Sequence, residues 1–176
     1  MAKINEMTMS EIVDRAVELG FPTKKSKGTI TIENSFATGD VTATSDRSGG
    51  LVGSLNNHGG IITIENSYAT GNVTGTNCVG GFIGRTYEYS TNSHNIISNS
   101  YATGNVTASG NSAGGFIGYV EDEWGKTTVE NSYATGNVTG ASYVGGFVGG
   151  SYSDRGREIF TISNSYSTGN VEASGN

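Results

Sequence analysis

Residues 28–176 alternate apolar and polar side chains over short runs, and no segment in this range has apolar residues at helical spacing. The runs read TITIE, ATGNVT and GGFIG, and they are separated by Gly and Asn. A period of two in β-branched and aromatic residues is typical of half-buried β-strands. The pattern therefore predicts an all-β fold for this part of the chain.

The runs belong to a repeat. One phrase, NSYATGNVT or a close variant, occupies 34–42, 66–74, 99–107, 131–139 and 164–172, and a second phrase of the form GG(L/F)(V/I)G follows each of the first four copies. Neighbouring copies start 32 or 33 residues apart and alternate copies start 65 apart, so the unit is a pair of unlike coils. A fixed period in this range indicates a stacked array. We predict a parallel, three-faced β-solenoid (β-helix) of about 4.5 coils.

Parity within each run predicts which side chains face the interior. In ATGNVT the small residues Ala37, Gly39 and Val41 share one side, and they suit a narrow interior. The isoleucines of TITIE are out of phase with this set, so the chain must turn between the two runs. Asn34 and its equivalents are placed at this turn, where Asn tolerates a positive φ. We expect these Asn side chains to stack as an amide ladder.

The GG phrase allows close backbone approach or a positive φ before an apolar pair. The first residue of each pair is expected to form an inward stack made of Leu51, Phe82, Phe116 and Phe147. The second is expected to face the other way; these residues are Ile83, Ile117 and Val148. Parity does not decide whether Phe36 and the four equivalent Tyr rings point in or out.

Residues 1–27 differ from the repeat and form a separate unit. Thr8 and Glu11 match a capping box, and the apolar residues that follow lie at helical spacing until Gly20 and Pro22. This predicts a helix over about residues 9–19. We expect it to cap the open end of the solenoid, because solenoid ends need protection from edge pairing. A separate docking module is the alternative.

Composition and charge narrow the class of protein. The chain has 176 residues with a net charge of −6, and it contains 28 Gly but 1 Pro. Such a chain suits one Gly-rich β domain and lacks the basic face of a nucleic-acid-binding protein. No stretch approaches the roughly 20 apolar residues of a membrane span. Cys78 is the single Cys, and we expect it to be an apolar filler.

The phrases NSYATGNVTG and VGGFIG, recurring in register over about residues 28–176, resemble the GLUG repeat of bacterial surface and secreted proteins. That family includes adhesin-like proteins and immunoglobulin A-cleaving metallopeptidases. The resemblance implies an extracellular stalk or binding region. It does not imply peptidase activity, because the HExxH motif is absent.

Candidate catalytic or metal-binding residues are few. His58 and His94 fall in different loops without a repeat-related Asp or Cys partner. Glu121, Asp122 and Glu123 form an acidic turn, which we interpret as solvated rather than as a calcium site, since hard cations usually gather six or more oxygens. We therefore expect a non-enzymatic protein with no catalytic residue, metal or cofactor.

The segments after the GG phrases vary most between coils, and we interpret them as loops along one edge of the rod. They carry aromatic residues of the kind used in protein or glycan contacts. Cover for sheet edges is the alternative role. The candidate binding residues on this loop edge are Tyr87, Tyr89, Tyr119, Trp124 and Tyr152.

The outward face of ATGNVT provides an alternative function. Its threonines are expected to form two columns, Thr38, Thr70, Thr103, Thr135 and Thr168, and Thr42, Thr74, Thr107 and Thr139. A regular Thr grid resembles the surface of ice-binding solenoids, although Thr is also simply a good strand residue.

The favoured function is an adhesion, binding or structural module of a bacterial surface or phage-fibre assembly, with an ice-binding protein as the alternative. Its expected partners are a protein or glycan on a cell surface, or copies of itself that pair end to end through the last, half-built coil. The start of the chain has no apolar signal segment. We therefore expect either a non-exported protein or a piece of a longer surface protein, with a phage virion as a further possibility.

Overall fold

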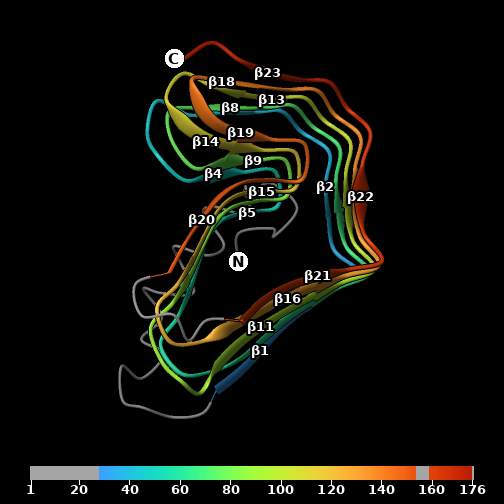
Figure 1. The fold of residues 1–176 in the computed structure, drawn as a ribbon. Coiled ribbons are helices and arrows are strands. Elements are labelled where there is room, and N and C mark those ends of the chain that lie inside the picture. The colour runs from blue at the N-terminus through green and yellow to red at the C-terminus, as the bar shows by residue number, and fades with distance from the viewer. Residues whose placement is uncertain (1–27, 154–158, 176) are drawn as a thin grey trace, which may run out of the picture.

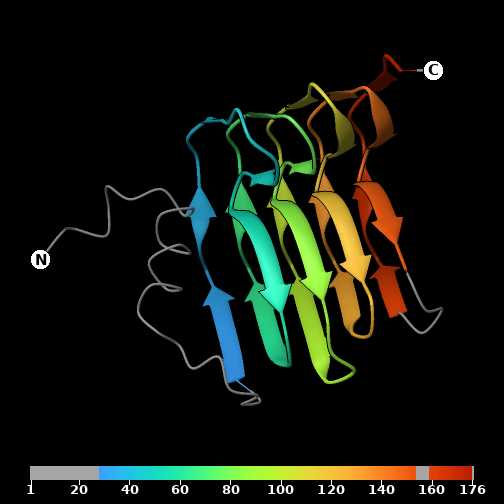
Figure 2. The ribbon, with the colours of Figure 1, turned by 90° about the vertical axis from the view of Figure 1, so that its left-hand side faces the viewer.

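The computed structural model describes residues 28–153 and 159–175, which form strands, turns and bends and contain no helix. The strands wind into successive coils that stack on one another in parallel (Figures 1 and 2). The all-β parallel solenoid predicted from the repeat is therefore confirmed. The expected capping helix at residues 9–19 lies outside the described residues.

Each of the first four coils contributes five strands, and the fifth contributes three. The first coil holds β1 (Gly28–Glu33), β2 (Phe36–Ala37), β3 (Val41–Thr42), β4 (Ser48–Gly49) and β5 (Val52–Asn57). The second holds β6 (Gly60–Glu65), β7 (Tyr68–Ala69), β8 (Val73–Gly75), β9 (Val79–Gly80) and β10 (Ile83–Glu88). The third holds β11 (Ser93–Ser98), β12 (Tyr101–Ala102), β13 (Val106–Ala108), β14 (Asn111–Gly114) and β15 (Ile117–Asp122). The fourth and fifth hold β16 (Lys126–Glu130), β17 (Tyr133–Ala134), β18 (Val138–Gly140), β19 (Ser142–Gly145), β20 (Val148–Tyr152), β21 (Ile159–Ser163), β22 (Tyr166–Ser167) and β23 (Val171–Ala173).

Equivalent strands stack into five parallel sheets, numbered here in their order around the coil. Sheet 1 is β1-β6-β11-β16-β21, sheet 2 is β2-β7-β12-β17-β22, sheet 3 is β3-β8-β13-β18-β23, sheet 4 is β4-β9-β14-β19 and sheet 5 is β5-β10-β15-β20. The single run ATGNVT supplies both sheet 2 and sheet 3, because the chain bends at its Gly. In Figure 1, which looks along the stack, sheet 2 lies at the right and sheet 1 below, while sheets 4 and 5 fold inward from the left.

The interior contains two apolar clusters. The larger one packs between sheets 1, 2 and 5, and includes Ile64, Ala69 and Ile83. The smaller one packs between sheets 3 and 4, and includes Val73 and Val79. Since the Ala, Gly and Val of ATGNVT are buried in the second to fourth coils, the predicted parity is confirmed.

The predicted inward stack of Phe side chains after the GG phrases is also confirmed. The Phe82 and Phe116 ring centres are 4.7 Å apart, and Phe147 follows Phe116 at 4.9 Å. The expectation that Ile83 faces the other way is wrong, because Ile83 is buried in the same cluster. The N–H groups of Phe82 and Ile83 both donate to the Phe116 carbonyl oxygen, at 3.0 and 2.9 Å. The chain bends at this doubled bond, as in a β-bulge, so two successive side chains face the core.

The two glycines of each GG phrase provide close approach rather than a positive φ. A Cβ on Gly80 would overlap the carbonyl oxygen of Ile83 in the same coil. A Cβ on Gly81 would overlap the carbonyl oxygen of Gly115 in the next coil. The first Gly therefore permits the bend, and the second permits the coils to stack.

The chain turns from sheet 1 to sheet 2 at an Asn in the left-handed conformation, as predicted. Its φ is between 47° and 51° in all five coils, at Asn34, Asn66, Asn99, Asn131 and Asn164. The Ser that follows adds a connection that the sequence analysis missed. Ser67 Oγ donates to the Glu65 carbonyl oxygen at 2.8 Å and accepts from the Ser35 N–H at 3.1 Å. The same pair of bonds recurs at Ser100 and Ser132, so the serines form a hydroxyl ladder.

The side-chain amide ladder that the structure shows lies at the bend between sheets 2 and 3, and not where it was predicted. The Asp40 and Asn72 side-chain oxygens accept the N–H groups of Asn72 and Asn105 at 2.7 and 2.9 Å. The same bond joins the next two coils, at Asn137 and Asn170. Each coil is thereby tied to its neighbour at the point where the chain changes direction.

The Tyr column that parity left open points outward. Tyr68, Tyr101 and Tyr133 follow a buried Ser and precede a buried Ala, and they are themselves half-buried. Their rings lie nearly parallel, with centres 4.9 and 5.0 Å apart. Phe36 and Tyr166 extend the stack at its two ends.

Candidate binding groove

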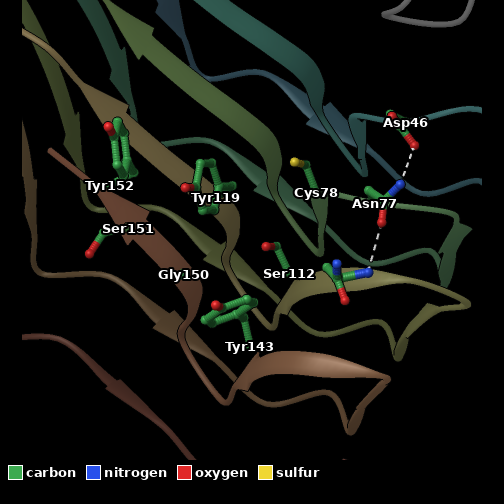
Figure 3. A pocket seen from close by; sticks show the side chains of 10 residues that line it. Asp46, Asn77, Cys78, Ser112, Tyr119, Tyr143, Gly150, Ser151 and Tyr152 are labelled. Carbon is green, nitrogen blue, oxygen red and sulfur yellow. Dashed lines mark hydrogen bonds between the residues drawn. The ribbon is translucent and has the colours of Figure 1, made fainter. Parts of the chain in front are cut away.

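A groove of about 510 Å³ crosses the first to fourth coils where sheets 4 and 5 adjoin. One wall comes from the residues that precede or begin the strands of sheet 4, and the other from sheet 5 (Figure 3). The lining residues are Asp46, Asn77, Cys78, Asn111, Ser112, Tyr119, Tyr143, Gly150, Ser151 and Tyr152. We call this surface the binding groove.

The wall on the side of sheet 4 is built by an unusual backbone conformation. The residue near the start of each strand has a positive φ, with values of 67° at Arg47, 53° at Cys78, 66° at Ser112 and 53° at Tyr143. None of these is Gly or Asn, which are the residues that adopt this conformation most readily. Repetition of this conformation in four coils places four unlike side chains in one column, and three of them line the groove.

A polar ladder runs beside this column. Asn77 donates from its amide nitrogen to Asp46 Oδ1 at 2.8 Å, and its own Oδ1 accepts the Asn111 N–H at 2.7 Å (Figure 3). The Asn77 side chain is thus held in place along the groove, between Asp46 and the Asn111 backbone. Amides in such a row offer both donors and acceptors to a ligand.

The wall from sheet 5 carries two outward columns. Arg85, Tyr119 and Gly150 are register partners in one column. The Tyr119 ring lies 3.1 Å from the place where a Cβ on Gly150 would stand, so the missing side chain leaves room for the ring. In the second column Glu121 lies between Tyr87 and Tyr152.

Arg85 is held firmly on this wall. Its Nε donates to Glu121 Oε2 at 3.0 Å, and a terminal nitrogen makes a second bond to the same oxygen. Its guanidinium carbon lies 4.7 Å from the centre of the Tyr87 ring, which is a cation–π contact. Tyr87 in turn donates from its hydroxyl to Glu123 Oε1 at 3.2 Å. This network orients a planar cation and an aromatic ring next to the binding groove.

The Cys78 thiol and the Tyr119 hydroxyl of the groove both have a raised pKa, which keeps them protonated at neutral pH. Burial raises the pKa of the Cys78 thiol, and the Arg85 charge offsets part of that rise. Burial, with the nearby Glu121 charge, also raises the pKa of Tyr119, and burial with the Glu123 charge raises that of Tyr87. The groove therefore presents hydroxyl donors and a thiol, and not a reactive thiolate.

The predicted binding residues are partly brought together. Tyr119 and Tyr152 line the groove, and Tyr87 lies on the same sheet beside it. Tyr89 and Trp124 fall in the turns after β10 and β15, and the Tyr89 ring contacts His58 at 5.9 Å between centres. The interpretation of the segments after GG as loops is wrong in part, because each segment begins with three or four residues of a sheet 5 strand. Its inward positions include polar residues, which hid the alternation expected of a strand.

The prediction that Glu121, Asp122 and Glu123 form one solvated turn is also wrong in part. Glu121 pairs outward with Arg85, whereas Asp122 is buried and only Glu123 lies in the turn. The two His residues have different neighbours. His58 packs near Tyr87 and Tyr89, whereas His94 Nε2 lies 3.1 Å from Thr128 Oγ1 on sheet 1. Among the described residues, no group of three or more His, Cys, Asp or Glu side chains gathers as a metal site.

The alternative Thr face is in register. Thr42, Thr74, Thr107 and Thr139 are successive partners along sheet 3, and Glu172 follows them. The other column, Thr38, Thr70, Thr103, Thr135 and Thr168, adjoins the ends of the sheet 2 strands. The bend at Gly39 and its equivalents lies between the two columns, so they do not form one flat sheet.

Two segments of the chain, residues 109–139 and 140–172, match the GLUG motif. The first segment runs from β14 of the third coil to β18 of the fourth, and the second runs from the end of β18 to β23 of the fifth. The strand register extends the same architecture to the first two coils. No match was found among curated proteins or among solved structures. In the part of the chain that the structure describes, no helix has the length and apolar character needed to cross a bilayer.

Proposed function

We propose that this chain, whose residues 109–139 and 140–172 are GLUG repeats on a β-solenoid, is a non-enzymatic binding module that uses the binding groove. GLUG repeats on a solenoid fit a structural or binding module. The observation that carries the finer proposal is the groove itself. It combines Tyr119, Tyr143 and Tyr152 with the side-chain amides of Asn77 and Asn111, of which Asn77 is held by two hydrogen bonds.

The chemistry of the groove favours a glycan as the ligand. Tyr rings present flat apolar faces and a polar hydroxyl at little cost in conformational entropy. Amide groups such as those of Asn77 and Asn111 form hydrogen bonds with sugar hydroxyls as donors and acceptors. The pair Arg85–Glu121 next to the groove supplies charge-assisted bonds. In this proposal the module is part of a bacterial surface or phage-fibre assembly and acts as an adhesin outside the cell.

A glycan array tests this proposal. The chain is expected to bind a defined set of oligosaccharides, and Tyr119→Ala and Tyr152→Ala are expected to lower the affinity at least about tenfold, as loss of a central aromatic contact does. Tyr89→Ala is the control, because Tyr89 is exposed but does not line the groove. Tyr101→Ala tests the outward Tyr column. Unchanged binding in both groove variants would reject the groove as the site.

Self-association is a second part of the proposal. Strands β21, β22 and β23 lie at the edges of their sheets in the described structure, and Ile159 and Val171 are exposed there. Edge strands with free backbone groups pair readily with another strand. We expect copies of the chain to stack coil on coil, which gives a concentration-dependent sedimentation coefficient. A constant monomer over the same range would reject this part alone.

Ice binding is the second candidate function, and the observation in its favour is the in-register exposure of Thr74 and Thr107. The bend at Gly71 between the two Thr columns disfavours it, because a regular ice face is flat. Thermal hysteresis decides the matter. Activity in the parent chain that is lost in Thr103→Tyr would establish ice binding, and its absence in the parent would exclude it.

A further inference from the structure

A polar cluster is buried inside the solenoid, away from the binding groove, at the corner where sheet 5 turns into sheet 1. Glu88 and Asp122 are register partners on β10 and β15, and each is at most 1% exposed. Asn57 occupies the same position on β5. Three further side chains, Ser93, Asn95 and Thr127, approach from sheet 1 and are also buried.

Three of these side chains are fixed by hydrogen bonds to other members of the cluster. Asn57 donates from Nδ2 to Asn95 Oδ1 and to the Gly60 carbonyl oxygen, both at 3.2 Å. Ser93 donates from its hydroxyl to the Asn57 carbonyl oxygen at 3.0 Å. Thr127 donates to Asp122 Oδ1 at 3.1 Å. The side-chain donors of Asn57, Ser93 and Thr127 are therefore used in these bonds.

Glu88 is the central feature. Both of its carboxylate oxygens are buried without a hydrogen-bond donor, and Asn95 Nδ2 is likewise without a partner. The missing Cβ of Gly125 makes space for Glu88, since a Cβ there would lie 2.6 Å from Oε2. A buried carboxylate without a donor or a cation costs several kcal/mol, on the order of a full desolvation penalty. Among the six side chains of the cluster none is a cation at any pH.

The electrostatics of the cluster agree with this geometry. Burial, and then the charge of Asp122, raise the pKa of Glu88 to about 9, and the nearby Ser93 hydroxyl opposes the rise.

We propose that this cluster is a binding site for a hard divalent cation, Ca²⁺, held by oxygens of Glu88, Asp122, Asn57, Asn95 and Ser93. Carboxylate, amide and hydroxyl oxygens are the ligands that Ca²⁺ takes, about six to eight at a time and in flexible geometry. Mg²⁺ fits less well, because it requires near-octahedral geometry and gives up its waters reluctantly. The six side chains include no His or Cys, so a softer metal has no preferred ligand there.

The ion would connect three coils, since Asn57, Glu88 and Asp122 belong to the first, second and third. The site is separate from the binding groove, because none of its members lines the groove. Rejection of the calcium proposal would therefore leave the proposed binding function intact.

Thermal unfolding of the full chain in Ca²⁺, in Mg²⁺ and in EDTA tests the site. At a Ca²⁺ concentration 100 times the Kd, the midpoint is expected to rise by roughly 5–10 °C over EDTA, and by less in Mg²⁺. Glu88→Gln keeps the shape of the side chain and removes its charge, and it should abolish the rise. Glu121→Gln, one residue before Asp122 but outward, should keep the rise.

A direct measurement covers the case in which Glu88→Gln does not fold. Tb³⁺, which replaces Ca²⁺ in oxygen sites, should luminesce when Trp124 is excited, because Trp124 lies two residues after Asp122. Ca²⁺ should displace it, and Asp122→Asn should lower the Tb³⁺ affinity at least about tenfold, since even loss of a group that only supports a metal ligand costs about that much. The proposal is overturned by an absent Ca²⁺ effect on the midpoint, by an equal effect of Mg²⁺, or by a Ca²⁺ effect that persists in Glu88→Gln.

Discussion

Asn72 and Asn105 are joined by a hydrogen bond of 2.9 Å from the Asn105 N–H to the Asn72 side-chain oxygen. Asn105 then accepts in the same way from the Asn137 N–H. The bond ties neighbouring coils at an exposed bend, where the strands of sheets 2 and 3 leave a gap in the backbone ladder. One acceptor oxygen per coil is therefore required at this position, and Asp40 supplies it in the first coil.

Replacement of Asn105 by Ala is expected to lower the free energy of unfolding by about 1 kcal/mol, because the Asn137 N–H loses its acceptor but remains open to water. Replacement by Asp keeps the acceptor and should cost less than half as much. Urea denaturation measures both. Equal losses for the two variants would show that the ladder bond contributes nothing.

The Gly in ATGNVT allows a paired test of coil stacking. A Cβ on Gly104 would overlap the carbonyl oxygen of Gly71 in the preceding coil, whereas a Cβ on Gly39 has nothing within 4 Å. Gly104→Ala is expected to lower the free energy of unfolding by about 3 kcal/mol or more, because the new methyl group overpacks against the backbone. Gly39→Ala should change stability by no more than about 1 kcal/mol. Thermal unfolding of both variants checks the contrast, and similar midpoints would contradict it.

The inward Phe stack contributes through burial and ring contact. Phe116 is completely buried between Phe82 and Phe147, so Phe116→Ala should cost about 3–5 kcal/mol. Phe116→Leu should cost roughly 1–2 kcal/mol, because Leu retains much of the buried area and stands at this position in the first coil as Leu51. Chemical denaturation gives both values. A smaller loss for Ala than for Leu would be inconsistent with this packing.

The raised pKa of Glu88 predicts how the free energy of unfolding depends on pH when a chelator is present. Its pKa rises from an ordinary value of 4.5 to about 9 in the folded chain, so the folded state keeps a proton that the unfolded state releases. The contribution of this group is complete below about pH 4.5 and is lost as pH rises toward 9. Glu88→Gln should remove this fall, and the comparison of its pH profile with the parent isolates the group. Parallel profiles would show that Glu88 does not titrate in this way.

Much of the fold was predictable, because the same local pattern recurs in every coil. The alternation of Ala69 and Val73 with outward Thr predicted the faces, and the chemistry of Asn predicted the left-handed corner that Asn66 occupies. Both inferences use interactions within a few residues. Repetition then extends them along the whole stack.

The candidate site and the buried cluster were less predictable, because they depend on side chains that contradict the local rules. Glu88 and Asp122 face the interior of strands that would otherwise have been recognised by inward apolar residues. Cys78 and Tyr143 adopt a positive φ without being Gly or Asn. The positive φ recurs at this position in four stacked coils, and the residue types found there give no signal for it.

All five sheets share one direction of hydrogen bonding, along the stack of coils. A pulling force applied from one end of the rod to the other therefore loads every coil-to-coil junction in series. The weakest junction gives way first, and the remaining coils keep their own bonds. A calcium ion that connects the first three coils would make them the mechanically stronger part, so rupture under load is expected to begin among the later coils.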